Sequence, residues 1–236
     1  MKRSIGFTLI EMAVAVFIIA LLLGSILVPL STQVKQRNVS DTQKSLEEIK
    51  EALMGFAIAS GYLPCPAISA TNGQEDRTAG VCTGGKRQGF IPWETLGVAK
   101  IDAWGHIFRY SVTPAYASSA APFTLATASD ITIQTRNSAG ALTNLTSANS
   151  VPAVVLSHGA NGYGSTNNQG TVQAVPPTWP GSFPDENTNA TGSTTFVSRA
   201  EQAAGASGAG GEFDDSVSWV ARFALYNRMV AAGKLP

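Results

Sequence analysis

Apolar residues are concentrated in one long run near the start of the chain. Between Met12 and Leu30 no residue is charged, and only three residues interrupt the hydrophobic side chains: Gly24, Ser25 and Pro29. An α-helix rises about 1.5 Å per residue, so about 20 apolar residues are enough to span a bilayer. The run is longer than the core of a secretory signal peptide, and no Ala-x-Ala cleavage site follows it. The pattern therefore predicts a transmembrane helix over residues 7–30.

The pattern becomes amphipathic after residue 30. Hydrophobic side chains recur at a spacing of three and four residues, which places them on one helix face: Leu46, Ile49, Leu53 and Phe56 or Ala57. Charged side chains occupy the opposite face: Lys44, Glu47, Glu48, Lys50 and Glu51. We expect the helix to continue through residues 31–60, with a kink at Pro29 and an end at Gly61 and Pro64. Its apolar face must then pack on another part of the protein.

Residues 61–236 carry the shorter patterns of a globular head. Alternating and β-branched segments predict four short strands, at residues 107–112, 123–127, 131–136 and 151–157. Ser129 and Asp130 are expected to form a tight turn between the second and third strands. Short consecutive strands favour an antiparallel sheet, which can bury one face on the helix. The predicted fold class is α+β, with Trp93 and Trp104 in the core of the head.

The end of the chain combines a polar stretch with a helical pattern. Residues 165–212 are rich in Gly, Asn, Thr, Ser and Pro, which predicts a long exposed loop that is most flexible at 203–211. Asp214 or Asp215 is expected to cap a short C-terminal helix that ends at Gly233. The apolar stripe of this helix would pack against the head and contains Val217, Val220, Ala221, Ala224, Leu225 and Met229.

Composition and charge narrow the classes of function. The chain has 236 residues, of which only 14% are charged, and its formal net charge is zero. A zero net charge offers no electrostatic basis for binding nucleic acid. Low charge and many small polar residues are typical of extracytoplasmic proteins, in which two cysteines more often pair than remain free. We therefore expect a disulfide between Cys65 and Cys82.

No set of residues indicates an enzyme. Ser157 and His158 are adjacent, so they do not point at each other along a strand, and no Gly-x-Ser-x-Gly motif surrounds Ser157. The only other histidine is His106, and neither histidine has metal-ligand spacing to another histidine or cysteine. Residues 80–86 match most of a phosphate-binding loop, but Arg87 stands where Ser or Thr would hold magnesium. We expect no catalytic residue, no cofactor and no set of metal ligands.

The residues before the apolar run carry a specific motif. Lys2 and Arg3 form a basic leader, which favours an N-terminus in the cytoplasm, and Gly-Phe-Thr-Leu-Ile-Glu follows at residues 6–11. This pattern resembles the prepilin signal of type IV pilins and type II secretion pseudopilins. The resemblance implies that a prepilin peptidase cleaves between Gly6 and Phe7 and then methylates the new amine of Phe7.

Glu11 lies just inside the apolar segment. An isolated carboxylate in hydrocarbon costs several kcal/mol unless it is paired or protonated. The resemblance implies that Glu11 pairs with the N-terminal amine of a neighbouring subunit during filament assembly. The alternative is a carboxylate that reaches the lipid headgroups from its position near the membrane edge. The complete motif around Glu11 favours the assembly role.

Two segments of the head resemble major pseudopilins. The first is Asp-Ala-Trp-Gly at residues 102–105, which an aromatic-rich strand follows. The second is Ser-His-Gly-Ala-Asn-Gly at residues 157–162, which is similar to a loop that helps to bind calcium in that family. Asn161 stands where an acid is more usual, and Asp214 and Asp215 are carboxylates that could contribute. We interpret this loop as a structural turn, with a calcium site as the alternative.

Together these features predict a pilin-like α+β protein with a long N-terminal transmembrane helix packed on a small antiparallel sheet, long loops and a short C-terminal helix. Its parts are a leader at 1–6, a transmembrane and filament-core helix at 7–30, an amphipathic continuation at 31–60 and a periplasmic head at 61–236. The expected function is that of a structural subunit of a type IV pilus-like filament. It would be a pseudopilin of a type II secretion system or, alternatively, a minor type IV pilin. A membrane-tethered periplasmic binding protein or hydrolase is a further alternative.

The same resemblance implies a location and a set of partners. The chain would cross the bacterial inner membrane once, with its N-terminus in the cytoplasm and its head in the periplasm, and would be extracted into a filament. Its partners would be the prepilin peptidase, other pilin or pseudopilin subunits, the inner-membrane assembly platform and membrane lipid, but not nucleic acid.

Overall fold

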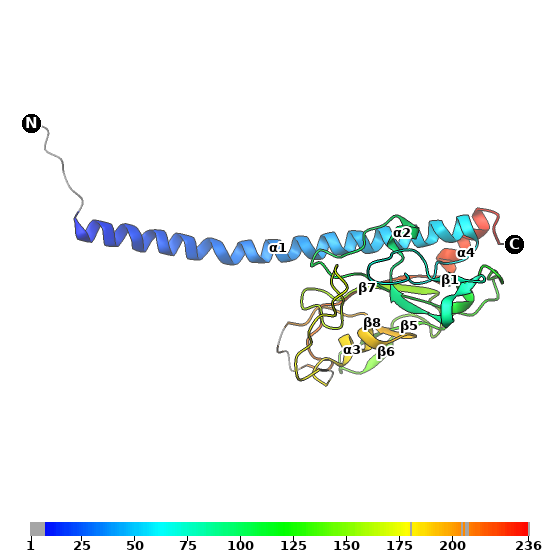
Figure 1. Cartoon of the computed structure of the whole chain (residues 1–236). Helices are drawn as coiled ribbons and strands as arrows, with labels where there is room; N and C mark the ends of the chain where they lie inside the picture. Colours follow the sequence, from blue (N-terminus) through cyan, green and yellow to red (C-terminus); the bar gives the residue numbers. More distant parts are fainter. Residues whose placement is uncertain (1–7, 180, 204, 206–207, 236) are drawn as a thin grey trace, which may run out of the picture. The chain divides into compact units, whose positions relative to one another are not determined.

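The computed structural model describes residues 8–179, 181–203, 205 and 208–235, without the side chains of residues 22–30. The chain divides into two compact units, Met1–Ser40 and Asp41–Pro236. The second unit contains the head and the C-terminal part of the long helix α1 (Figure 1). Its architecture is α+β, with this part of the helix packed on antiparallel strands, as the hydrophobic pattern predicts.

Helix α1 (Leu9–Ser60) is continuous over 52 residues and passes through Pro29. It ends where expected, because Gly61 adopts a φ of 86° and its N–H donates to the carbonyl of Ala57 at 2.7 Å. A glycine in the left-handed conformation commonly closes the last turn of a helix. Among the described residues, we find no helix with the length and hydropathy that crossing a membrane would require.

The apolar face of α1 enters the main core of the head. Its buried side chains follow the predicted stripe, with Met54 added: Leu46, Ile49, Leu53, Met54 and Ala57. Ala57 completes the stripe, whereas the ring of Phe56 packs edge-on against Tyr62. Burying one large aliphatic side chain stabilises a fold by about 1.5–3 kcal/mol. The stripe therefore holds this part of α1 to the sheet.

A four-stranded antiparallel sheet forms the centre of the head. Its strands, in spatial order, are β3 (Gln88–Phe90), β4 (Arg109–Val112), β7 (Ala153–Ser157) and β9 (Ser216–Val220). Every residue of β7 is buried. Ala153 and Val155 belong to the core beneath α1, whereas Val154 and Leu156 belong to a second core on the opposite face. This alternation follows the two-residue period of a strand.

A second sheet of three strands covers that opposite face. Its order is β6 (Leu142–Asn144), β5 (Thr132–Arg136) and β8 (Thr195–Val197), and β5 and β8 run parallel. Ile131, Ile133 and Phe196 pack from this side against the residues of β7. The prediction of one small antiparallel sheet is therefore incomplete, because the central sheet is covered on both faces.

Shorter elements complete the head: β1 (Arg77–Thr78), β2 (Val81–Cys82), the 3-10 helices η1 (Thr83–Gly85) and η2 (Pro114–Tyr116), and the helices α2 (Trp93–Leu96), α3 (Pro184–Thr191) and α4 (Arg222–Ala231). A disulfide joins Cys65 to Cys82, with Cα atoms 5.4 Å apart. Trp93 packs at the edge of the main core, and Trp104 is only partly buried. The prediction that both tryptophans belong to the core of the head is therefore confirmed only for Trp93, which packs against the core from a partly buried position.

The predicted strand at residues 123–127 is absent. Phe123 is buried against the ring of Tyr116, with 4.8 Å between their centroids. The carbonyl of Thr127 accepts hydrogen bonds from the hydroxyls of Tyr116 at 2.7 Å and Tyr226 at 2.9 Å. This carbonyl is thus satisfied by tyrosine hydroxyls instead of by a neighbouring strand.

The tight turn expected at Ser129 and Asp130 is also replaced by tertiary contacts. The hydroxyl of Ser129 donates to the carbonyl of Asn149 at 2.9 Å. The carboxylate of Asp130 accepts two hydrogen bonds from the guanidinium of Arg87, each of 2.7 Å. A bidentate pair of this kind fixes geometry as well as charge.

The apolar pattern near the C-terminus is divided between a strand and a helix. Residues 216–220 form β9 and pair with β7, so Val217 and Val220 lie on a strand. Helix α4 begins only at Arg222, after Ala221 in the N-cap position, so neither of the two preceding aspartates caps it. The prediction fails because valines spaced by three residues fit a helix face, while pairing with β7 required a strand here. The later stripe residues Leu225 and Met229 are buried as predicted.

Residues 165–212 are not one exposed loop. They contain α3 and β8. Their buried side chains include two acids, an amide and two hydrophobic residues: Asp185, Glu186, Asn189, Phe196 and Val197. The amide of Asn189 donates to the carbonyl of Val197 at 2.9 Å and accepts from its N–H at 2.7 Å. Polar groups that are hydrogen-bonded in this way can be buried, which composition alone does not reveal. Of the predicted flexible stretch 203–211, residues 204, 206 and 207 lie outside the described part of the chain.

Candidate functional site

The start of α1 is closed by reciprocal hydrogen bonds between Thr8, which precedes the helix, and Glu11 in its first turn. The N–H and the hydroxyl of Thr8 both donate to Oε2 of Glu11 at 2.8 Å. The N–H of Glu11 donates to the hydroxyl of Thr8 at 3.3 Å. This capping box satisfies N–H groups that have no partner within the helix. It also holds the Glu11 carboxylate at the beginning of the helix.

The first turns of α1 expose large apolar side chains at closely spaced positions: Leu9, Ile10, Met12, Val14, Val16, Phe17, Ile18, Ile19 and Leu21. Glu11 is the only charged residue between residues 9 and 21. A helix that is apolar on all sides needs lipid or other helices around it. One acid within such a surface also needs a partner of opposite charge.

Residues 1–27 match the family model of the prokaryotic N-terminal methylation motif. The chain carries the signal of type IV pilins and pseudopilins. This pilin signal implies processing by a prepilin peptidase and assembly with other pilin subunits. Gly6 and Phe7, the expected sites of cleavage and methylation, lie outside the described residues. No curated protein and no solved structure matches the chain.

Beyond the pilin signal, Asp102 connects the two head segments that resemble pseudopilins. Its Oδ1 atom accepts the N–H groups of Trp104 and His106, each at 2.9 Å. Its Oδ2 atom accepts the hydroxyl of Ser157 at 2.6 Å. The segment at 102–105 is thereby attached to the last residue of β7, where the second segment begins.

Asn161 organises this loop. Its N–H donates to Oδ2 of Asp214 at 2.9 Å, and its side-chain amide donates to Oε1 of Glu186 at 2.9 Å. Its own Oδ1 accepts the N–H of Tyr163 at 3.0 Å, which forms the turn that the sequence predicts. The structure therefore brings Asn161 and Asp214 together. The asparagine forms a structural turn and at the same time positions carboxylates.

Glu186 is the residue of this site that the sequence analysis missed. It lies in the first turn of α3 and is fully buried. One oxygen from each of Glu186, Asp214 and Asp215 lies within 4.8 Å of the others, and we call these three residues the carboxylate cluster. Between residues 165 and 198 the only charged residues are Asp185 and Glu186. This isolated acidic pair is the sequence signal from which Glu186 could have been predicted as a residue of the site.

The cluster strongly favours protonated or neutralised carboxylates. Burial raises the pKa of Glu186 to about 8, and the nearby Asp215 and Asp214 add to the shift. Burial also raises the pKa of Asp214 to about 7, against the lowering effect of the N–H of Asn161. Like charges this close in a dehydrated site disfavour ionisation. The arrangement can hold protons or a cation.

The residues considered above as candidates for catalysis or phosphate binding lie close to other residues of the fold. Ser157 donates to Asp102, whereas the buried His158 has its Nδ1 3.5 Å from Oδ1 of Asp215. The lysine of the segment that resembles a phosphate-binding loop, Lys86, donates to the carboxylate of Asp76 at 3.1 Å. Ser157 and Lys86 are thus held by hydrogen bonds within the fold, whereas Nδ1 of His158 faces Asp215 without a hydrogen bond among the described residues.

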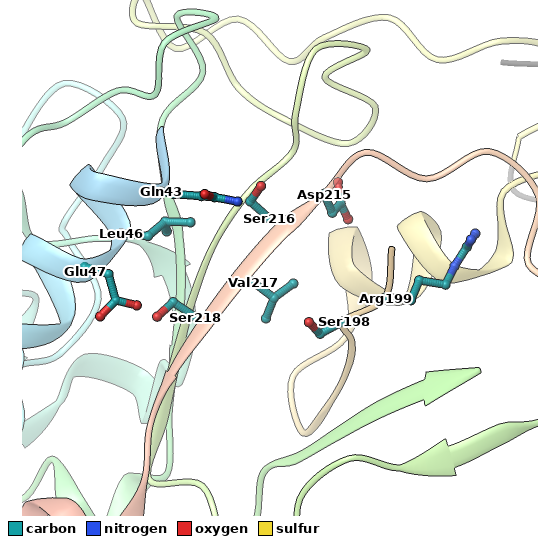
Figure 2. Close-up of a pocket in the computed structure, with 9 residues that line it drawn as sticks. All are labelled: Gln43, Leu46, Glu47, Ser198, Arg199, Asp215, Ser216, Val217 and Ser218. Carbon is teal, nitrogen blue, oxygen red and sulfur yellow. The ribbon is translucent and has the colours of Figure 1, made fainter. Parts of the chain in front are cut away.

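A pocket of about 390 Å³ adjoins the cluster. Figure 2 shows it between α1, which contributes Gln43, Leu46 and Glu47, and β9, which contributes its first three residues. Asp215 directly precedes the first residue of β9 and also borders the pocket. The pocket therefore reaches the cluster from the side of α1.

Proposed function

We propose that this protein is a structural subunit of a type IV pilus-like filament, made as a prepilin in the bacterial inner membrane. The observation that supports this most directly is the methylation motif at residues 1–27, which runs into α1 without a break in the sequence. The helix over 7–30 would cross the membrane once, with the leader in the cytoplasm and the head in the periplasm. The pilin-like fold and the absence of catalysis are parts of the same proposal.

Processing would create the partner that Glu11 needs. Cleavage between Gly6 and Phe7 places a methylated amine at the start of the mature chain. Both hydrogen bonds that Thr8 donates end on Oε2 of Glu11. We therefore propose that Oε1 accepts a hydrogen bond from the amine of a neighbouring subunit. The exposed apolar side chains of the first helical turns would then exchange lipid for neighbouring helices as the filament grows.

Among the filament systems, we propose a pseudopilin of type II secretion. The segments at 102–105 and 157–162 support this choice, because both resemble major pseudopilins and Asp102 links them. The second candidate is a minor type IV pilin, which the long segment at 165–212 with its own helix and strand favours. Deleting the gene would separate the two, since loss of exported hydrolases indicates a pseudopilus and loss of surface pili indicates a pilus.

Mass spectrometry of the mature N-terminus tests the proposal itself. We expect a chain that begins at Phe7 and carries one added methyl group. A Gly6→Val variant serves as the matched control and should retain residues 1–6 because the peptidase site is blocked. An intact Met1 in the wild-type chain, or cleavage after the apolar run, would contradict the proposal.

A further inference from the structure

Strand β9 forms one edge of the central sheet, because it pairs with β7 on one side only. Its five residues, Ser-Val-Ser-Trp-Val, include no charged residue, proline or glycine. Proteins usually block such an edge with a charge, a proline or a covering segment, since its unpaired N–H and C=O groups can bind another strand. Among the described residues, none outside β7 makes a backbone-to-backbone hydrogen bond with β9. The edge of β9 is therefore open.

Other edges of the two larger sheets are covered or short. On β3, the carbonyl of Phe90 accepts a hydrogen bond from the N–H of Ala67 at 2.9 Å. On β8, the side-chain amide of Asn189 takes the place of a neighbouring strand, because it bonds both the N–H and the carbonyl of Val197. The remaining edge strand, β6, is only three residues long. A five-residue edge without cover is thus a distinctive feature of β9.

The register of the central sheet shows which backbone groups of β9 face outward. The carbonyl of Pro152, just before β7, accepts a hydrogen bond from the side of β4 at 2.8 Å. The direction of bonding alternates along an antiparallel strand, so Val155 bonds toward β9, where its partner is Ser218. By the same alternation, the N–H and C=O groups of Val217 and Trp219 point away from β7.

This open edge borders a groove between β9 and α1. The pocket of Figure 2 and a second pocket of about 380 Å³ share Glu47 and two residues of β9. Both cations that line the two pockets are already paired. Lys50 forms an ion pair with Glu47, and Arg199 forms one with Asp185 at 2.7 Å. The groove therefore offers backbone hydrogen bonds and apolar contacts, and it suits an uncharged strand better than a charged one.

The chain itself carries a segment of matching chemistry, Thr-Val-Gln-Ala-Val at residues 171–175. This segment is the second arm of a hairpin, in which the N–H of Gln173 donates to the carbonyl of Ser165 at 2.9 Å. Because Gln173 bonds inward, its neighbours Val172 and Ala174 direct their N–H and C=O groups outward. Among the described residues these groups make no backbone hydrogen bond, and all five residues of the segment are exposed.

We propose that residues 171–175 of one copy of this chain pair, as an antiparallel strand, with β9 of the next copy. This inference rests on the filament function proposed above. The contact joins two different surfaces, so each copy would keep one of them free for a further copy. Contacts of this head-to-tail kind generate open filaments when the rotation between copies does not close a ring. The pairing would therefore add a contact between heads to the packing of the N-terminal helices.

Matching the outward groups of the two segments sets the register. It gives three opposed pairs: Trp219 with Val172, Ser218 with Gln173, and Val217 with Ala174. Residues opposed across two strands share one face of the sheet. The first and last pairs are apolar and lie on the face of the second core, against which Val217 and Trp219 pack. The middle pair is polar and lies on the face of α1, where Ser218 borders the groove.

Disulfide cross-linking of the full chain tests this contact. Ser218 and Gln173 would form a non-hydrogen-bonded pair, in which opposed side chains come closest, so cysteines at these positions should join. The two native cysteines already bond to each other, and the chain has no others. Membranes of cells that produce the Ser218→Cys, Gln173→Cys chain are oxidised with copper phenanthroline. We expect a ladder of covalent multimers, whereas a mixture of the two single variants should stop at the dimer.

Two further variants show whether strand pairing causes the cross-link. Thr143→Cys, on the exposed edge strand β6, replaces Gln173→Cys in the matched control and should give no ladder. Ala174→Pro, added to the doubly substituted chain, removes an outward N–H that makes no backbone hydrogen bond among the described residues. It should lower the yield of multimers roughly tenfold and leave the unfolding temperature of the head unchanged. Val172→Asp provides the same comparison if Ala174→Pro does not fold.

The outcomes separate this inference from the proposed function. A chain that is cleaved, methylated and recovered in filaments, but gives no ladder, overturns the inference and leaves the proposed function intact. The inference also fails if Ser218→Cys joins an exported protein instead of another copy, or if Ala174→Pro leaves the ladder at full yield. An intact Met1 would contradict the proposed function, and with it the filament in which the contact is placed.

Discussion

At the scale of single residues, Glu11 combines two roles that are easily confused. Within one chain its Oε2 atom caps the helix through Thr8, which is a local and modest effect. In a filament the same carboxylate would meet a neighbour's amine in an apolar environment, where an unpaired charge is far more costly. Mutation of the two partners should therefore separate capping from assembly.

We expect Glu11→Ala to be cleaved and methylated normally but to be lost from filaments. Thr8→Ala is the matched comparison, because it removes the cap at a cost of about 1 kcal/mol and keeps the acid. Thr8→Ala should therefore still assemble. The measurement is the amount of subunit in sheared or cross-linked filaments, with mass spectrometry to confirm processing. Wild-type levels of filament from Glu11→Ala would rule out the assembly role.

The carboxylate cluster predicts an unusual pH dependence of the free energy of unfolding, measured with divalent cations removed. In the folded chain the pKa of Glu186 is about 8 and that of Asp214 about 7, above the usual values of 4.5 and 3.8. The folded state therefore binds more protons than the unfolded state between these values. Stability should fall as pH rises through the window from about pH 4 to about pH 8.

Urea unfolding in EDTA across that pH range measures the effect, with Glu186→Gln as the comparison. Glutamine does not titrate, so the variant should lose stability less steeply with pH. His106 contributes in the same direction, because the carboxylate of Asp102, 3.7 Å from its Nδ1, raises its pKa, but it is present in both proteins. Equal slopes for the two chains would show that Glu186 is not protonated in the folded state.

At the scale of elements, local patterns were reliable where one period extends over many residues. The part of α1 after residue 40 was predicted with its buried stripe because apolar side chains recur over several turns and Gly61 ends the helix. The start of α4 was missed because the residues of β9 also suit a helical stripe. Residues 123–127 were misassigned because their partners are tyrosines that lie elsewhere in the sequence.

The disulfide between Cys65 and Cys82 is expected to stabilise the segment between α1 and the central sheet. It closes a loop with a sequence separation of 17 residues, for which loop entropy predicts about 3 kcal/mol. We expect reduction with dithiothreitol to lower the urea midpoint accordingly. A chain with Cys65→Ala and Cys82→Ala should unfold at the lower urea midpoint whether or not dithiothreitol is present. An unchanged midpoint on reduction would mean that the loop is held by its hydrogen bonds, such as that from Arg77 to the carbonyl of Ala117 at 2.7 Å.

At the scale of the whole molecule, the pilin signal and the hydrophobic cores lie in different units of the chain. The pilin signal lies in the first unit, whereas both hydrophobic cores consist of residues from Leu46 onward. The head should therefore keep its stability without the first unit, while the ability to enter a filament should be lost.

Deletion of residues 1–40 tests this division. We expect the shortened chain to unfold at the same temperature as the head of the full chain, because no core side chain has been removed. Deletion of residues 1–55 is the comparison and should destabilise the head strongly, since it removes four buried side chains of the stripe: Leu46, Ile49, Leu53 and Met54. Circular dichroism and thermal unfolding provide the measurement. A head that unfolds when only residues 1–40 are absent would contradict the division.

The sequence by itself determined the pilin signal, the acid within the apolar run and the buried stripe of α1. Each depends on residues that are near one another in the chain, so motif and periodicity are sufficient to read them. Only the tertiary structure decided that a polar segment is partly buried and that Glu186 joins Asp214 and Asp215. The contacts of Glu186 with these two acids connect residues more than 25 positions apart, as its 28-residue separation from Asp214 illustrates. They depend on how the strands of the head pair and pack, and no local pattern records that.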